Sequence, residues 1–207
     1  MIRYRIGLDF DNTVVSYDHL LQEEAIQRGW LEAAASSGKR AIRDRIRQRP
    51  QGEQKWRQLQ AVVYSVRMRE AVLSEGVDRF VARCRQQGAA VFVVSHKTEY
   101  AAGDATAHLR AAALAWMQAK GLFRAEGWGL SRGQVYFEST RQEKVQRIRA
   151  LRCTHFIDDL EETFLEPTFP AQVARILYDP YGQATSASPV RIARTWEQVA
   201  AYVFDGV

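Results

Sequence analysis

The sequence is poor in cysteine, and this scarcity excludes two kinds of small fold. Its 207 residues include only two cysteines, Cys84 and Cys153, which lie far apart in the chain. They form neither a CxxC pair nor a zinc-binding spacing, so neither a disulfide-stapled scaffold nor a structural zinc site is expected. We predict two reduced thiols, as is usual for a protein of the cytoplasm.

Long apolar runs are also missing. The uncharged apolar stretches are far shorter than the roughly 20 residues that a membrane-spanning helix needs. Near the N-terminus, Asp9 interrupts the apolar residues before the core of a signal peptide could form. The chain has no low-complexity tract and no repeat of fixed period. We therefore expect a cytoplasmic protein without membrane contact, built as one domain or one domain with an insertion.

The charge is uneven along the chain. The formal net charge is +5, and between Arg28 and Glu70 eleven basic residues face four acidic ones. The densest basic stretch covers residues 38–50. It is either a solvated helix face or a surface that gathers anionic substrates. No aromatic residues interleave with these arginines, so stacking of single-stranded nucleic acid is not indicated.

Apolar runs alternate with helical patterns over most of the chain. Apolar residues make up 46% of the sequence, enough for a sizeable core. Thr140 and Glu143 have the spacing of a capping box at a helix start. The predicted strands cover residues 3–9, 89–95, 134–138, 154–158 and 173–179, and the predicted helices about 77–87, 104–120, 140–151, 161–165 and 195–204. This alternation predicts an α/β fold, a Rossmann-like parallel sheet with helices on both faces.

One segment does not fit a simple crossover between strands. Residues 17–73 carry apolar residues at helical spacing, with a break at Pro50 and Gly52. The segment is too long for a single connection. We predict a small helical domain inserted after the first strand, with residues 1–16 and 74–207 forming the catalytic core.

Polar residues end three of the predicted strands. Asp9, Ser95 and Asp158 each follow an apolar run, and an open α/β sheet places its site at the carboxyl ends of its strands. Asp9 and Asp11 point the same way if the chain stays extended. Burying two like charges together is unfavourable unless a cation or a shared proton offsets them. A hard cation such as Mg²⁺ suits these oxygen ligands and a phosphate substrate.

The remaining polar residues extend this pattern toward phosphate chemistry. The Ser95 hydroxyl and nearby backbone N–H groups are suited to hold a phosphoryl oxygen. Lys144, in the helix before the next strand, is placed to neutralise a nucleophile and a phosphate together. Asp158 and Asp159 supply a second set of carboxylates for a magnesium shell.

In this order, these pieces resemble the haloacid dehalogenase-like (HAD) superfamily. DFDNT at residues 9–13 resembles the first motif of that family, and VFVVS at 91–95 the second. Lys144 matches the third motif, and FIDD at 156–159 the acidic fourth. The resemblance implies a HAD-like fold, and it makes residues 17–73 look like a C1-type cap that closes over the site.

The resemblance also implies a role for each motif residue. Asp9 would be the nucleophile and Asp11 the general acid/base. Ser95 and Lys144 would bind the transferring phosphoryl group, and Thr13 would support the first motif. The implied Mg²⁺ ligands are Asp9, the Asp11 main-chain carbonyl and Asp158, with Asp159 orienting the metal shell or its waters.

Two points of the motif pattern stay open. Asn12 stands where many family members have glycine, although asparagine also tolerates left-handed backbone. Lys97 lies two residues after Ser95 and rivals Lys144 as the phosphate-binding lysine. If Lys144 is the phosphate-binding lysine, Lys97 is instead a possible contact to the substrate or the cap, and His96, beside Ser95, is a possible substrate contact.

The implied activity is a Mg²⁺-dependent phosphomonoesterase that acts on a small phosphorylated metabolite, such as a phosphosugar or a nucleotide. Asp11 argues against a dehalogenase, because that branch lacks the second aspartate. Two alternatives stay open. A polynucleotide 3′-phosphatase would use the basic segment 38–50 to grip a nucleic-acid backbone, and a non-catalytic HAD-like protein would act in binding or as a scaffold.

Overall fold

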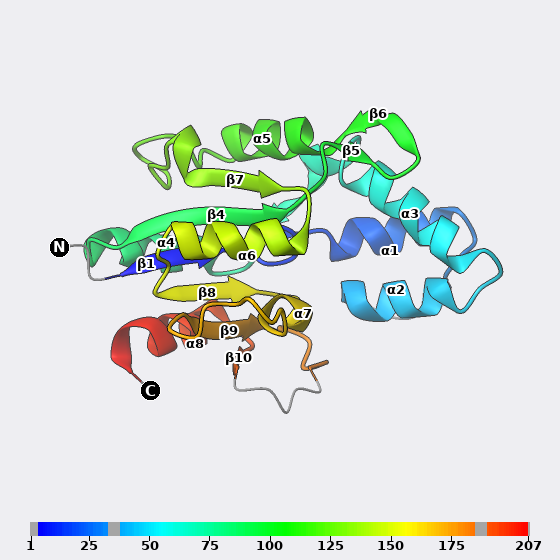
Figure 1. Ribbon diagram of the computed structural model, residues 1–207. Coiled ribbons are helices and arrows are strands. Elements are labelled where there is room, and N and C mark those ends of the chain that lie inside the picture. The colour runs from blue at the N-terminus through cyan, green and yellow to red at the C-terminus, as the bar shows by residue number, and fades with distance from the viewer. Residues whose placement is uncertain (1–3, 33–37, 185–189, 207) are drawn as a thin grey trace.

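The computed structural model describes residues 4–32, 38–184 and 190–206 (Figure 1). Its centre is a six-stranded, all-parallel sheet with the order β10-β9-β8-β1-β4-β7. The strands are β1 (Arg5–Leu8), β4 (Ala90–His96), β7 (Val135–Glu138), β8 (His155–Asp158), β9 (Ala174–Tyr178) and β10 (Arg191–Ala193). The predicted α/β fold is confirmed, and all five predicted strands form, although Arg3 of the first lies outside the described residues.

Strand β1 occupies the middle of the sheet. Ile6 pairs with Val91 of β4 on one side and with His155 of β8 on the other. Since all three strands run in parallel, their carboxyl ends reach the same edge. The residues that follow β1, β4 and β8 therefore lie next to one another.

Helices cover both faces of the sheet, as predicted. Side chains alternate along β4, so that Val91 and Val93 join one hydrophobic cluster while Phe92 and Val94 join the other. The first cluster includes α4 (Val77–Gln86), α5 (Leu109–Ala119) and α8 (Trp196–Ala200), and the second α6 (Arg141–Ala150) and α7 (Glu161–Phe164). Cys84 and Cys153 are free thiols, buried one in each cluster.

The segment after β1 is helical, as expected. It leaves the core through β2 (Val15–Ser16) and returns through β3 (Val72–Leu73), which pair antiparallel. Between them lie α1 (Asp18–Gln27), α2 (Lys39–Arg47), α3 (Gly52–Val63) and the short 3₁₀ turn Met68–Glu70. In Figure 1 these helices lie beyond the arrowheads of the parallel strands. Residues 33–37 of this segment are outside the described part of the chain.

A helix was predicted over residues 104–120, and the predicted position of its first residue is wrong. Residues Asp104–His108 form β6, which pairs antiparallel with β5 (Tyr100–Ala101), and α5 begins only at Leu109. Gly103 makes the turn with a positive φ of 84°. The Asp104 carboxylate accepts hydrogen bonds from the backbone N–H and hydroxyl of Thr106. Such local side-chain bonds favour turns over helix.

The C-terminal part also departs slightly from expectation. Thr195 caps α8 by accepting a hydrogen bond from the Gln198 N–H, as predicted, but a π-helical turn at Ala201–Asp205 completes the predicted helix. Strand β10, at the sheet edge, was not expected from the sequence. Across the described ranges, no helix is long and apolar enough to cross a membrane.

Candidate active site

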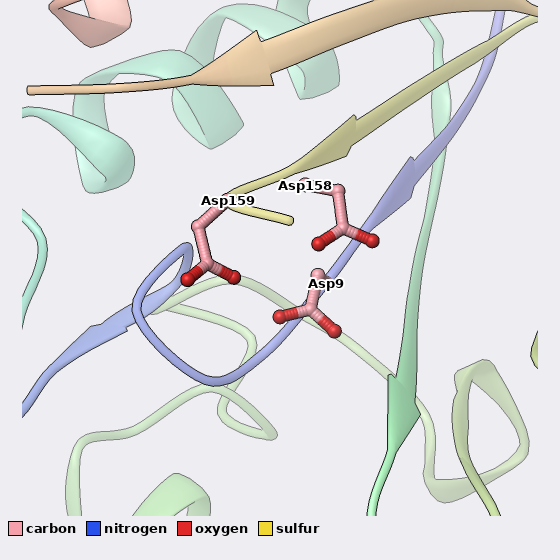
Figure 2. Close-up of side chains that lie close together, drawn as sticks. All are labelled: Asp9, Asp158 and Asp159. Atoms are coloured by element: carbon pink, nitrogen blue, oxygen red, sulfur yellow. The ribbon is translucent and has the colours of Figure 1, made fainter. Parts of the chain in front are cut away.

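Three carboxylates meet at the carboxyl edge of the sheet. Asp9 follows β1, while Asp158 ends β8 and Asp159 follows it. One oxygen from each side chain lies within 4.8 Å of the others (Figure 2). Asp9 is 5% exposed and Asp158 is fully buried. The Asp9 N–H donates to the Ile157 carbonyl at 2.9 Å, which fixes the two strand ends together.

Lys144 lies between two of these carboxylates. Its Nζ is 2.6 Å from Asp9 Oδ1 and 2.7 Å from Asp158 Oδ2. The capping box of Thr140 and Glu143, confirmed in the structure, starts the helix that carries Lys144 to this position. Burial alone would lower the pKa of the Lys144 ammonium, but Asp158 and Asp9 outweigh it and raise that pKa. Lys144 is therefore a permanent cation of the site.

Lys97 also reaches the site, but it contacts a different aspartate. Its Nζ is 2.9 Å from Asp11 Oδ2, and its side chain is buried. The hydroxyl of Tyr17 donates to Asp11 Oδ1 at 2.7 Å. Asn12 takes a left-handed φ of 63°, which turns the chain sharply after Asp11. The structure thus places the two rival lysines at opposite carboxylates of the first motif.

The surroundings of the cluster disfavour the ionised form of its carboxyl groups. Burial raises the pKa of Asp9 to about 8, and the nearby Asp158 and Asp159 act in the same direction while Lys144 opposes them. Burial likewise raises the pKa of Asp159 to about 6, opposed by Lys39. Carboxylates held this close would be stabilised as anions by a hard divalent cation.

Several buried polar atoms of the site have no hydrogen-bond partner among the described residues. They include Ser95 Oγ, Thr13 Oγ1 and Asp159 Oδ1. Ser95 is 1% exposed and Thr13 is fully buried. Buried polar groups are normally satisfied, so unsatisfied ones at an acidic cluster mark positions where a ligand can bind. The donor set of oxygens fits Mg²⁺, and the free hydroxyl of Ser95 fits a phosphoryl oxygen.

His96 is the predicted residue that the structure places apart from the carboxylates. Its side chain is exposed, and Nε2 lies 3.0 Å from the Ser139 carbonyl oxygen. Partial desolvation of the imidazole by its neighbours lowers the pKa of His96. The other predicted site residues, Asp9, Asp11, Thr13, Ser95, Lys97, Lys144, Asp158 and Asp159, gather around the strand ends.

The helical segment contributes residues that sequence reasoning gave no role. Lys39, the first residue of α2, reaches Asp159 Oδ2 at 3.2 Å. Asp18, the first residue of α1, accepts hydrogen bonds from Asn12 Nδ2, the Lys39 N–H and the Tyr181 hydroxyl. These contacts join three distant segments, and no local sequence pattern indicates them.

A cavity of about 540 Å³ opens beside this cluster, between the start of α2, the β2–β3 pair and the loop after β9. Asn12, Lys39 and Asp159 are among the residues that line it. Asp9, Asp11, Ser95 and Lys144 are not in its lining, whereas Lys39 and Asp159, which pair with each other, are. The cavity therefore adjoins the acidic cluster at Asp159.

Comparison with known proteins identifies the fold. No protein-family model and no curated protein sequence matches this chain. Several solved structures, however, do match this chain. A haloacid dehalogenase-like hydrolase from Streptococcus pneumoniae is 13% identical, with a TM-score of 0.59, over 96% of this chain and 97% of that one.

Two further structures are similar over their whole length. A HAD family hydrolase from Deinococcus radiodurans, with bound phosphate and sodium, is 12% identical with a TM-score of 0.58, over 97% and 95% of the two chains. A HAD-hydrolase from Bacillus subtilis bound to magnesium is 14% identical with a TM-score of 0.52, over 98% and 99%. The chain thus has the HAD-like fold that its motifs predict.

Proposed function

We propose that this protein is a Mg²⁺-dependent phosphomonoesterase that works through an aspartyl-phosphate on Asp9. One observation carries the proposal: Lys144 bridges Asp9 and Asp158 inside a buried carboxylate cluster that also holds the unpartnered hydroxyl of Ser95. A nucleophile, a cation and a phosphoryl-binding donor then lie within one edge of the sheet.

The metal would be held by the carboxylates of Asp9 and Asp158 and by the main-chain carbonyl of Asp11, with Asp159 orienting its shell. When bound, Mg²⁺ screens the repulsion between the carboxylates and a phosphate dianion. The fold neighbour from Bacillus subtilis that binds magnesium supports this choice of cation. The neighbouring carboxylates that raise the pKa of Asp9 support it independently.

The chemistry follows from the positions of the side chains. An Asp9 oxygen forms a bond to phosphorus while the bond from phosphorus to the ester oxygen breaks. Asp11 gives its proton to that leaving oxygen. Asp11 then takes a proton from a water molecule, whose oxygen attacks the phosphorus and releases Asp9 and inorganic phosphate. Ser95 and Lys144 bind the phosphoryl oxygens during both steps, and Thr13 supports the loop. The phosphate bound in the Deinococcus radiodurans structure is consistent with such a ligand.

We assign residues 17–73 the role of a cap over a core made of residues 1–16 and 74–207. The contacts of Lys39 with Asp159 and of Tyr17 with Asp11 support this division, because both bring the helical segment to the carboxylates. Deleting or crosslinking the segment should change rate and specificity. Unchanged kinetics in such a variant would contradict the role.

A small leaving group agrees better with the cavity than a polynucleotide does. More acidic than basic side chains line it among the described residues. On α2, the exposed Arg47 pairs with Glu53, and Arg43, which lines the cavity, pairs with Asp44. These pairs support the solvated-face interpretation of segment 38–50. The proposed substrate is therefore a small phosphate ester such as a phosphosugar or a nucleotide.

The test is phosphate release from a panel of phosphorylated metabolites, with Mg²⁺ or with EDTA, by wild type and by Asp9→Asn. We expect release that needs both the metal and Asp9, while circular dichroism shows that the variant keeps its fold. Activity retained in Asp9→Asn would remove the proposed nucleophile. Absence of release from metabolites and from phosphorylated nucleic-acid ends would favour the non-catalytic binding protein.

A further inference from the structure

Both carboxylate oxygens of Asp11 are already engaged by buried side chains. The Tyr17 hydroxyl donates to Oδ1 at 2.7 Å, and the Lys97 ammonium lies 2.9 Å from Oδ2. Tyr17 is fully buried and Lys97 is 3% exposed. The two donors therefore exchange little with water, and they restrict the rotation of the Asp11 carboxyl group from two sides.

Lys97 belongs to the sheet side of the site. It follows β4, and its N–H donates to the Glu138 carbonyl of β7 at 2.9 Å. Its own carbonyl accepts a hydrogen bond from Arg110 Nε at 2.8 Å. The Lys97 backbone is thus fixed to both β7 and α5, and its side chain approaches Asp11 from a rigid base.

Tyr17 belongs to the helical segment. It lies between β2 and α1, where the chain enters that segment. Its ring centroid is 4.6 Å from that of Tyr64, which ends α3, and its hydroxyl is 3.1 Å from Met68 Sδ. The position of the Tyr17 hydroxyl therefore depends on how both ends of the helical segment pack.

We propose that Lys97 and Tyr17 are positioning residues that aim the Asp11 carboxyl group at the leaving oxygen of the substrate. The inference rests on the proposed phosphatase function. Each carboxyl oxygen has two sites, so one site on each can accept a hydrogen bond from a fixed donor while a remaining site, which faces the substrate, carries the proton that Asp11 gives to the leaving oxygen and later takes from water. Because one donor comes from the sheet and the other from the helical segment, Asp11 is aligned only when that segment is seated.

The experiment compares Tyr17→Phe and Lys97→Met with wild type on two esters. One is an alkyl phosphate, whose leaving oxygen needs a proton. The other is p-nitrophenyl phosphate, whose nitrophenolate leaves without one. Since general acid catalysis contributes about 10²–10⁴-fold, we expect kcat/KM for the alkyl ester to fall roughly 10–100-fold in each variant. For the aryl ester, kcat/KM should change less than about 3-fold on the same argument.

A second readout follows the breakdown of the phosphorylated enzyme. A misaligned Asp11 activates water poorly, so the variants should release a rapid burst of nitrophenolate followed by a slow steady state. In an Asp11→Asn background, adding Tyr17→Phe or Lys97→Met should cause no further loss, because both act through Asp11. Tyr202→Phe and Lys120→Met, which remove the same groups where they contact Ile192 and Trp116 instead of Asp11, serve as matched controls.

The outcomes separate this inference from the function on which it rests. Selective loss on the alkyl ester, with no added loss in the Asp11→Asn background, supports the positioning role. Equal loss on both esters, or losses that add to Asp11→Asn, overturns it even though the phosphatase stands. Wild type that hydrolyses neither these two esters nor any member of the metabolite panel overturns the phosphatase and the positioning role together. Circular dichroism and melting temperatures show whether each variant is folded.

Discussion

Lys144 and Lys39 both reach the carboxylate cluster, but they come from different regions and are held in different ways. Lys144 stands on α6, in a helix layer packed on the sheet, and makes two contacts of 2.6 and 2.7 Å. Lys39 begins α2 in the helical segment and makes one contact of 3.2 Å. The side chain of Lys144 is 1% exposed and that of Lys39 is 14% exposed. The sheet region holds its charge by two short, buried contacts, whereas the helical segment adds a charge through one longer and more exposed contact.

The largest effect should come from the sheet region. Lys144→Met removes the cation between Asp9 and Asp158 and leaves two buried carboxylates facing each other. Breaking a buried pair by removing one partner costs about 3–5 kcal/mol, so urea unfolding should show a loss of that size. Phosphate release should become undetectable. Lys39→Met serves as the comparison, and the contrast between the regions disappears if that variant is as unstable as Lys144→Met.

Two glycines give a second contrast. A Cβ on Gly7, in β1, would lie 2.5 Å from Phe156 Cδ2, inside the closely packed sheet. Overpacking of this kind costs about 1–3 kcal/mol, which a lower urea midpoint would reveal in Gly7→Ala. A Cβ on Gly38 would meet the Tyr181 ring, which is 48% exposed, so that displacing it costs only the hydrogen bond from its hydroxyl to Asp18. Gly38→Ala should therefore raise KM and leave the urea midpoint nearly unchanged. The same stability loss in both variants would contradict this expectation.

Lys39 itself should affect how metal binding depends on pH. Its charge lowers the pKa of Asp159, which burial has raised to about 6. In Lys39→Met that pKa rises further, so protons compete more strongly with Mg²⁺ as the pH falls from 8 toward 6. As the pH falls, the Mg²⁺ concentration that gives half-maximal rate should therefore rise more steeply in Lys39→Met than in wild type. Parallel pH dependences in the two proteins would show that Lys39 does not act on Asp159.

The smallest effect should come from a histidine on the sheet. Burial lowers the pKa of His155, and Arg191 acts in the same direction. The folded-state pKa is then below the unfolded value of about 6.5, so the unfolded state binds more protons as the pH falls through that value. His155 should therefore reduce stability in acid. The melting temperature should drop less between pH 8 and pH 5.5 in His155→Gln than in wild type, and an equal drop would exclude His155 as the cause.

The sequence predicts the sheet region much better than the connections between regions. Buried parallel strands produce continuous apolar runs, and Asp9, Ser95 and Asp158 could be placed at one edge because each ends such a run. The β5–β6 hairpin escaped prediction because Asp104 and Thr106 form it through local side-chain bonds, and its residues lack a continuous apolar pattern.

The sequence also could not decide whether Lys97 or Lys144 is the phosphate-binding lysine. Both lysines follow the motif pattern, yet only the packing of α6 and of the end of β4 decides which aspartate each contacts. Lys39 could not be predicted at all, because it reaches Asp159 across 120 positions of sequence. Contacts of this kind depend on how the helical segment sits over the sheet, and short-range patterns do not encode that.

The central place of β1 in the sheet also has a consequence for biosynthesis. Ile6 is synthesised well before His155, at which β8, one of the two neighbouring strands of β1, begins. At typical synthesis rates of about 5–20 residues per second, the nascent chain waits on the order of ten seconds before this strand can be flanked on both sides. Until then the backbone N–H and C=O groups along one edge of β1 are unpaired and can bind the strands of other chains. Asp9, the proposed nucleophile, thus directly follows a strand that stays incompletely paired until most of the described chain has been synthesised.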